Sequence, residues 1–197
     1  NDAGSTWMPS GNLGFIRVRD IATDPVDLDR VYIATGQFGR QVLRSLDGGA
    51  TFSTVLDGYT EEGGACSMNT VVVNPHDPRH LFAGGGNHYL PYASGALWQS
   101  SDGGDTWAQS DLPTVIVNSI LVDPVDPDVV YAGCGFSYNR GIPPVFKSID
   151  GGETWIPKTK GFPSRRVFIA DLWAASAHYA VGVGENGLVL VYDGQSA

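Results

Sequence analysis

The chain has 197 residues, of which 42% are hydrophobic, with 26 glycines, 12 prolines and a formal net charge of −9. This length is enough for one well-buried domain, and the glycine and proline content is typical of short strands joined by tight turns. The acidic balance disfavours a nucleic-acid surface, which needs a basic patch, and the longest apolar runs are strand-sized and too short to span a membrane.

The chain opens inside a sequence motif, at residues 2–7, without an initiator Met or a signal-peptide pattern. We therefore expect a processed product or a fragment. Few lysines and many Gly, Thr, Trp and Tyr residues suggest an exported protein, extracellular or periplasmic. The two cysteines, Cys66 and Cys134, either form one bridge or remain free buried thiols, and the sequence leaves both open.

Three short apolar segments then recur in a fixed order along the chain. The first ends in an Asx-Pro turn, the second is rich in small residues, and the third ends in Ser. The successive copies of these three segments cover residues 21–27, 31–36 and 42–45, then 71–77, 81–85 and 96–100, then 120–126, 130–133 and 145–148. Their lengths and composition predict strands, and proline fixes the turn after the first of them.

A Ser-x-Asp-Gly-Gly-x-Thr-Trp motif, with small variations, follows each third segment. Its aspartates, with a truncated copy at the start, are separated by 45 (47 − 2), 55 (102 − 47) and 48 (150 − 102) residues. We expect the Asp to accept backbone N–H bonds, the glycines to take positive φ, and a fourth strand to start at the Thr. The EF-hand spacing of a calcium site is absent. The motif residues predicted to be structural are Asp2, Trp7, Ser45, Asp47, Thr51, Phe52, Asp102, Thr106, Trp107, Ser148, Asp150, Thr154 and Trp155.

A four-strand unit with a period near 50 residues predicts an all-β fold, a β-propeller of four-stranded blades. We divide the single domain, residues 1–197, into complete blades at 11–58, 59–111 and 112–160 and a closing blade. That closing blade takes three strands from 161–197 and its outer strand from 1–10, which gives four blade equivalents. A self-closed ring, a ring completed by a second copy or another fragment, and an arc of a larger ring all fit.

The motif resembles the Asp-box, or BNR repeat, of sialidases, sortilin-like receptors, family 74 xyloglucanases and photosystem II assembly propellers. The segment 21–36, followed by 43–51, looks most like the xyloglucanases. The resemblance implies a binding face opposite the Asp-boxes, built by the loops between second and third strands and by the connections between blades. The loop residues that we predict to contact a ligand are Tyr89, Tyr92, Phe136, Tyr138, Asn139 and Arg140.

Glycoside hydrolysis would need two carboxylates flanking the scissile bond. No spacing in the sequence pairs two of the candidates, which are Asp20, Glu61, Glu62, Asp171 and Glu185. The resemblance implies a substrate cleft between two complete propellers, which this chain cannot supply, and no catalytic Asp motif matches. Six arginines would serve a sialidase (Arg17, Arg19, Arg40, Arg140, Arg165 and Arg166), but no Phe/Tyr-Arg-Ile-Pro segment precedes the first complete box.

The residues predict neither a metal site nor a cofactor. His76 and His80 flank a turn without a third ligand, and no glycine-rich phosphate loop opens a helix. We predict a binding or assembly module for a polysaccharide or a protein. The alternatives are part of a family 74-like glycoside hydrolase acting on xyloglucan-type polysaccharide, and a self-assembling extracellular structural protein. A homo-oligomer or another propeller fragment could complete the ring.

Overall fold

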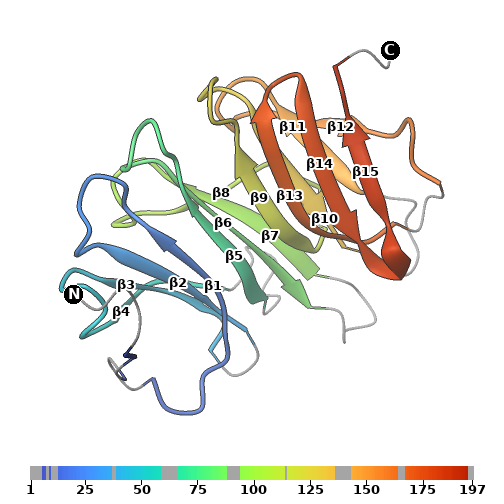
Figure 1. The fold of residues 1–197 in the computed structure, drawn as a ribbon. Helices are drawn as coiled ribbons and strands as arrows, with labels where there is room; N and C mark the ends of the chain where they lie inside the picture. Colours follow the sequence, from blue (N-terminus) through green and yellow to red (C-terminus); the bar gives the residue numbers. More distant parts are fainter. Residues whose placement is uncertain are drawn as a thin grey trace.

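The protein is an all-β structure in which four antiparallel sheets follow one another along the chain (Figure 1). The computed structural model describes residues 6–7, 9, 13–36, 39–58, 66–87, 94–113, 115–135, 143–163 and 167–194. Over these residues the only helical element is the 3₁₀ turn η1, Glu185–Gly187. The described residues contain no helix with the length and apolarity to cross a bilayer.

The first three sheets have four strands each, paired in sequence order. The first contains β1 (Val18–Thr23), β2 (Val31–Thr35), β3 (Gln41–Ser45) and β4 (Ser53–Asp57). The second contains β5 (Ser67–Val73), β6 (Leu81–Asn87), β7 (Ser94–Ser100) and β8 (Ala108–Gln109). The third contains β9 (Val117–Val122), β10 (Val130–Cys134), β11 (Val145–Ser148) and β12 (Ile156–Lys158). This meander of four strands confirms the predicted propeller blade.

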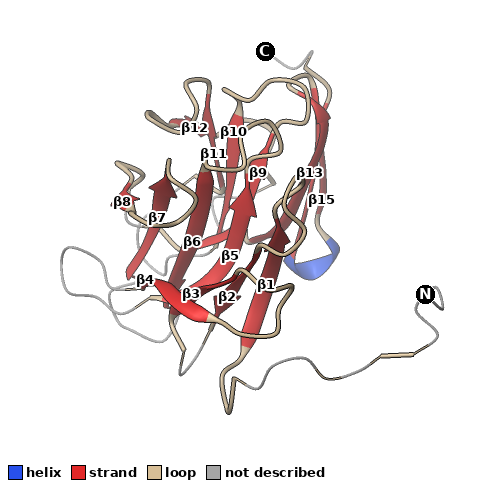
Figure 2. Cartoon of the chain, turned by 90° about the vertical axis from the view of Figure 1, so that its left-hand side faces the viewer, coloured by secondary structure: helices blue, strands red, loops and turns tan. Residues whose placement is uncertain are grey.

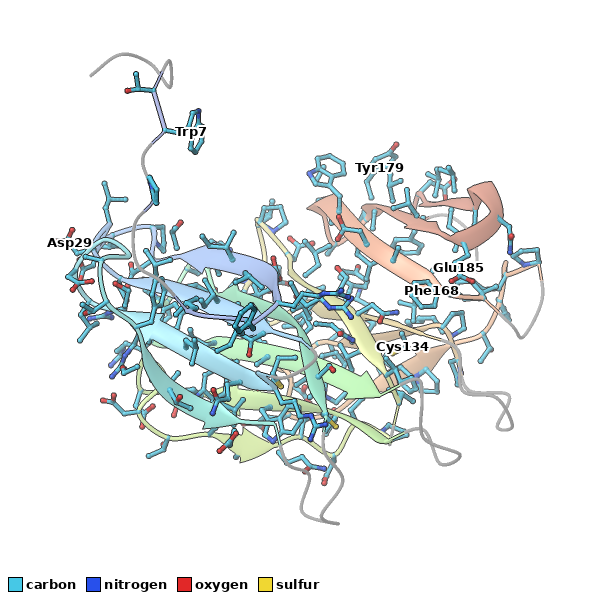
Figure 3. All side chains as sticks on the ribbon, turned by 90° about the horizontal axis from the view of Figure 1, so that it is seen from below. Trp7, Asp29, Cys134, Phe168, Tyr179 and Glu185 are labelled. Atoms are coloured by element: carbon cyan, nitrogen blue, oxygen red, sulfur yellow. The ribbon has the colours of Figure 1, made fainter. Side chains whose placement is uncertain are left out.

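The fourth sheet has three strands, β13 (Ile169–Ser176), β14 (Tyr179–Gly184) and β15 (Val189–Tyr192). It lies at the opposite end of the row from the first sheet (Figure 1). Of the segment 1–10, predicted to add its outer strand, the structure describes Thr6, Trp7 and Pro9. None of these is in a strand, and the side chain of Trp7 is 91% exposed and projects away from the sheets (Figure 3). Closure of the ring by this segment stays a prediction.

The cores lie between neighbouring sheets, because each middle strand is covered on both faces. Strands β2 and β10 are buried along their whole length. Small residues let the sheets approach: a Cβ added at Gly84 would lie 2.5 Å from Val117, and one added at Gly133 would lie 2.7 Å from Ile169. This close approach explains the small-residue segments of the repeat, since a larger side chain there would push the sheets apart.

The Asp-Gly-Gly motif forms a closed turn between the third and fourth strands. In the second sheet, Asp102 Oδ1 accepts hydrogen bonds from the amide of Thr106 (2.9 Å) and the hydroxyl of Ser100 (2.8 Å), and Oδ2 accepts one from Thr106 Oγ1 (2.6 Å). Ser100 Oγ in turn accepts the amide of Gly104 at 2.9 Å. Both glycines of the turn have positive φ, 78° and 88°, the region that glycine enters without steric cost.

The turns at Asp47 and Asp150 repeat this bonding pattern. The prediction that the fourth strands start at Thr51, Thr106 and Thr154 is wrong by two residues, because they start at Ser53, Ala108 and Ile156. The physical reason is that the amide and hydroxyl of each Thr are bonded to the motif aspartate, so the Thr belongs to the turn. The truncated copy at Asp2 lies outside the described residues.

Candidate ligand-binding face

The two ends of each sheet carry different chemistry. At one end the Asp-box turn is bonded to the Asx-Pro turn of its own sheet, through Gly48 N to Asp29 O (2.9 Å), and equivalently from Gly103 and Gly151. At the other end β1 starts opposite the end of β2, where Val18 pairs with Thr35. The loops between second and third strands therefore emerge at the end away from the Asp-boxes. We call this end the loop face.

The loop residues predicted to bind a ligand lie outside the described residues. These are Tyr89, Tyr92, Phe136, Tyr138, Asn139 and Arg140. The same is true of Glu61 and Glu62 among the predicted carboxylates. The described part of the loop face includes the starting residues of the innermost strands, β1, β5, β9 and β13, and the turn η1 between β14 and β15.

Polar side chains on these innermost strands link one sheet to the next. We call Asp20, Asn69, Asn118, Ser119 and Asp171 the inner polar belt. Asn69 Nδ2 donates to the carbonyl of Val117 at 3.0 Å, and Asn118 Nδ2 donates to the carbonyl of Ile169 at 2.9 Å. Each bond joins a strand to the innermost strand of the following sheet. The belt therefore fixes the register between sheets at the loop face.

A β-bulge in each innermost register produces this arrangement. The register shifts lie between Val18 and Asp20 in β1 and between Met68 and Thr70 in β5. Equivalent shifts occur opposite Cys134 in β9 and between Ile169 and Asp171 in β13. A bulge inserts one residue and redirects the side chains around it, which turns polar side chains toward the next sheet.

The predicted carboxylates Asp20 and Asp171 occupy equivalent positions in the first and last sheets. Asp20 Oδ1 accepts the amide of Ile21 at 2.8 Å, and its Oδ2 accepts the amide of Val71, in the next sheet, at 3.1 Å. Asp171 Oδ1 accepts the amide of Leu172 at 2.8 Å and the hydroxyl of Ser119 at 2.9 Å. These bonds give both carboxylates a role in joining sheets.

The structure does not bring Asp20 and Asp171 together, since they stand at the two ends of the row of sheets. Glu185 is exposed in η1, on the loop face of the last sheet. It follows Val183, the register partner of Asp171, by two residues. Asp171 and Glu185 are thus the two described candidates that share a sheet and a face.

An exposed arginine adds positive charge to the described loop face. The side chain of Arg19 packs over Gly36, where an added Cβ would lie 2.7 Å from Arg19 Nε. The amide of Gly36 donates to the carbonyl of Arg17 at 2.8 Å, which ties the start of the loop after β2 to the approach to β1. An exposed guanidinium beside polar backbone can donate several hydrogen bonds to hydroxyl or carboxylate oxygens.

Ser119 belongs to the belt although it was not among the residues predicted from the sequence. Its hydroxyl accepts the amide of Leu172 at 3.2 Å, as Asp20 accepts that of Val71. A signal was present, because Asp20, Thr70 and Ser119 each stand four residues before an Asx-Pro turn (24 − 20, 74 − 70, 123 − 119). A repeated column of side-chain oxygens beside an apolar strand indicates a shared hydrogen-bonding task.

Two histidines and the two cysteines make contacts that do not involve the inner polar belt. His76 Nε2 lies 3.1 Å from the carbonyl of Asp123, and His80 stacks near Phe82 with ring centroids 4.5 Å apart. Cys66 and Cys134 are both buried and no disulfide joins them, so the second of the two alternatives for the cysteines holds in the structure. Burial raises the pKa of the Cys134 thiol far above its ordinary value, which keeps it unreactive.

Comparison with known proteins gives xyloglucanases as relatives, although no protein-family profile matches the chain. A xyloglucanase of Paenibacillus is 29% identical over 93% of this chain, and one of Acetivibrio thermocellus is 31% identical over 76%. The chain spans about a fifth of the length of these curated relatives, 21% in each case.

Solved structures give the same fold. An ancestral GH74 enzyme superposes with a TM-score of 0.67 and 20% identity, covering 90% of this chain and 23% of its own. YCF48 bound to D1 peptide superposes with a TM-score of 0.61 and 13% identity, covering 92% of this chain and 53% of its own. At such identities the likeness concerns the fold alone. This chain is a run of β-propeller blades with a turn that resembles the Asp-box in each of its first three sheets, and it is similar in sequence to xyloglucanases.

Proposed function

We propose that the chain is a polysaccharide-binding β-propeller segment that holds a xyloglucan-type chain on its loop face. The observation that carries the proposal is the sequence similarity to two xyloglucanases, which in one case extends over 93% of the chain. We also propose that the protein is extracellular, where such a polysaccharide is found. A neutral sugar chain offers hydroxyls and apolar ring faces, which loop aromatics and exposed polar groups bind.

The geometry of the carboxylates favours binding over catalysis in the described part of the chain. Asp20 and Asp171 hold neighbouring backbone amides and Ser119. The Asp-box carboxylates are bonded within their own turns at the opposite end of the sheets. A general acid or base must instead be free to reach the reacting proton. In this proposal Arg19 and the loop aromatics contact the sugar.

Binding can be tested by affinity electrophoresis of the chain in gels containing xyloglucan, with a gel lacking polysaccharide and one containing laminarin as references. We expect retardation in xyloglucan that weakens severalfold in Arg19→Ala and in the Tyr89→Ala/Tyr92→Ala double variant. The matched control is Arg79→Ala, since Arg79 is an exposed arginine at the Asp-box end whose side chain pairs with Asp77. Equal mobility in all gels would overturn the proposal.

A second candidate is that the chain contributes a catalytic carboxylate to a hydrolase, which the xyloglucanase relatives favour. Asp171 and Glu185 are the described pair on one face of one sheet. Reducing sugar released from xyloglucan by the chain, and lost in both Asp171→Asn and Glu185→Gln, would support this candidate. Binding without release would leave the chain as the binding segment alone.

A further inference from the structure

We propose that three arginines on the loop face of the first sheet form a binding site for the carboxylate group of an acidic sugar unit. These residues are Arg17, Arg19 and Arg40, and we call them the arginine cluster. Because it takes a polysaccharide on the loop face as given, this site rests on the proposed function, and it adds a charged sugar unit to the chemistry of that ligand.

One turn, at Gly36, brings the three arginines together. The amide of Gly36 donates to the carbonyl of Arg17 at 2.8 Å, and the carbonyl of Gly36 accepts the amide of Arg40 at 2.9 Å. The side chain of Arg19 lies over the same residue, where a Cβ added to Gly36 would be 2.7 Å from Arg19 Nε and 3.1 Å from its Cγ. The buried Gly36 therefore leaves the space that the side chain of Arg19 occupies.

Arg19 departs from the hydrogen bonding of its equivalents in the other sheets. The bulge residues Asn69 and Asn118 each donate through Nδ2 to a carbonyl of the next sheet, at 3.0 and 2.9 Å. Arg19 is the bulge residue of β1, between Val18 and Asp20. Within the described part of the chain its guanidinium makes no such bond, and the side chain is exposed. A guanidinium that does not join sheets has its donors available for a ligand.

The ion pairs of the described arginines differ between the two ends of the sheets. The three arginines at the Asp-box end each pair with a carboxylate, and the pairs are Arg30–Asp24 (3.3 Å), Arg44–Asp105 (2.7 Å) and Arg79–Asp77 (3.0 Å). Among the residues that the structure describes, the arginine cluster forms no ion pair. The whole chain has 21 Asp and Glu residues for 12 Lys and Arg residues, so carboxylates are plentiful. The unpaired charge on the loop face can therefore attract an anion from solution.

The acidic residue next to Arg19 has other partners. Asp20 Oδ1 accepts the amide of Ile21 at 2.8 Å, and Oδ2 accepts the amide of Val71 at 3.1 Å. A bulge redirects the side chains around it and often lies beside a functional site. In β1 it gives two consecutive residues separate tasks, because Asp20 joins two sheets while Arg19 faces solvent over the turn.

Arg40 is held in a backbone conformation that arginine rarely adopts. Its φ is 58°, and Asn186 is the other non-glycine residue with a positive φ in the described part of the chain. The conformation is fixed from both sides, since the amide of Arg40 donates to Gly36 and its carbonyl accepts the amide of Gly58 at 2.7 Å. Glycine adopts such a φ at lower cost. An arginine at a position that favours glycine indicates a task for its side chain beyond folding.

A carboxylate suits the arginine cluster better than a neutral sugar does. A guanidinium donates two parallel N–H bonds to the two oxygens of a carboxylate, and such charged bonds are roughly twice as strong as neutral ones. General attraction cannot produce this binding, since the chain has a net charge of −9 and as a whole repels polyanions. A preference for an acidic polysaccharide therefore reports the local site. We take a uronic acid unit as the ligand group.

Calorimetric titration of the 197-residue chain with two forms of one polymer tests the site. The probes are xyloglucan and the same xyloglucan after part of its primary hydroxyls has been oxidised to carboxylates. We expect the oxidised form to bind about three- to tenfold more tightly at low salt. The preference should disappear at high salt, because screening weakens ion pairs between exposed groups.

Substitutions at two of the arginines separate a ligand role from a structural one. Arg19→Asn gives the first sheet the residue found at the bulges of the next two sheets, so we expect the preference to be lost while the urea midpoint of unfolding stays equal or rises. Arg40→Gly should also lose the preference without a loss of stability, because glycine relieves the positive φ. Arg79→Ala removes an exposed arginine at the Asp-box end and is the matched control, which should keep the preference.

The possible results distinguish this site from the proposed function. Equal affinity of wild type for the two forms would overturn the carboxylate site and leave polysaccharide binding standing, whereas no binding of either form would overturn both. A preference that survives in Arg19→Asn and in Arg40→Gly would also overturn the arginine cluster. Binding of polyglutamate as tight as that of oxidised xyloglucan would overturn the assignment to a uronic acid unit, because the site would then take a carboxylate without its sugar.

Discussion

The first three sheets and the last sheet are built from the same antiparallel strands, but they differ in their turns and in how deeply their side chains are buried. Each of the first three contains an Asp-box turn and buries a row of side chains under the following sheet. The last sheet has three described strands and exposes the equivalent row, including Trp173. The difference separates residues that stabilise a blade from residues that join blades. Figure 2 shows how the innermost strands β1, β5, β9 and β13 lie along one side of the molecule, where the joining residues gather.

The largest expected effect comes from the row that joins the second and third sheets. Phe82 is fully buried, so Phe82→Ala removes a large apolar contact and leaves a cavity between sheets. We expect a loss of about 3–5 kcal/mol in the free energy of unfolding. Trp173→Ala, on the exposed side of the last sheet, serves as the comparison and should cost under about 1 kcal/mol because the ring is 57% exposed.

Urea unfolding of both variants, followed by tryptophan fluorescence and circular dichroism, measures the difference. Equal losses in the two variants would mean that the last sheet is as fully covered in solution as the internal sheets. That result, at concentrations where the chain is monomeric, would break the comparison.

The next effect concerns the buried hydroxyl of the Asp-box turn. Ser100 is 3% exposed, and its Oγ accepts the buried amide of Gly104 at 2.9 Å. Ser100→Ala leaves that amide without a partner, for which we expect a loss of about 1–3 kcal/mol. The neighbouring exposed Ser101 provides the control, and Ser101→Ala should stay within about 0.5 kcal/mol of wild type. A neutral Ser100→Ala would show that water replaces the hydroxyl and that the turn does not depend on it.

A smaller effect follows from the Asp-box carboxylates. Hydrogen bonds lower the pKa of Asp47 to about 2, chiefly from the Thr51 hydroxyl, and that of Asp150 to about 2, chiefly from the Ser148 hydroxyl. Because the pKa in the folded state lies below the ordinary value of 3.8, the stabilisation is present above about pH 4. It is lost as pH falls through about 2. We expect the three Asp-box turns to loosen in this window.

Carboxyl carbon shifts in an acid titration measure these pKa values directly, and amide exchange of Thr51, Thr106 and Thr154 reports the turns. Asp102→Asn removes one titrating group, so the protection factor of its own turn, which is the exchange rate corrected for the intrinsic effect of pH, should no longer change as the pH falls. The pKa of Asp102 is lowered as well, chiefly by the Thr106 hydroxyl. Midpoints near the ordinary aspartate value, about 4, for all three residues would contradict the hydrogen-bonded turn.

The sequence predicted the blade more fully than the junction. Strands such as Val31–Thr35 and the paired glycines of each turn followed from apolar runs and turn chemistry, because these depend on local geometry. The start of the fourth strands was misplaced because the bonds from Thr51 to Asp47 are a side-chain effect that strand propensity does not contain. The roles of Asp20 and Asp171 in joining sheets depend on bulges and on residues about 50 positions away. The alternation of apolar and polar residues within one strand does not show which residues of another sheet that strand will contact.

The smallest prediction addresses the junction itself. Asn118 Nδ2 donates to the carbonyl of Ile169 in the next sheet, and the equivalent bulge position of the last sheet is Ala170. We expect Asn118→Ala to lower the free energy of unfolding by about 0.5–1.5 kcal/mol. Ala170→Asn should change it by less than about 0.5 kcal/mol in the monomer, because among the described residues no carbonyl of a following sheet is present to accept the new bond.

Urea unfolding of the two variants, followed by circular dichroism, measures the difference. An Asn118→Ala variant as stable as wild type would mean that this side-chain amide does not join the two sheets. A loss in Ala170→Asn as large as that in Asn118→Ala would place Ala170 among the residues that stabilise a blade.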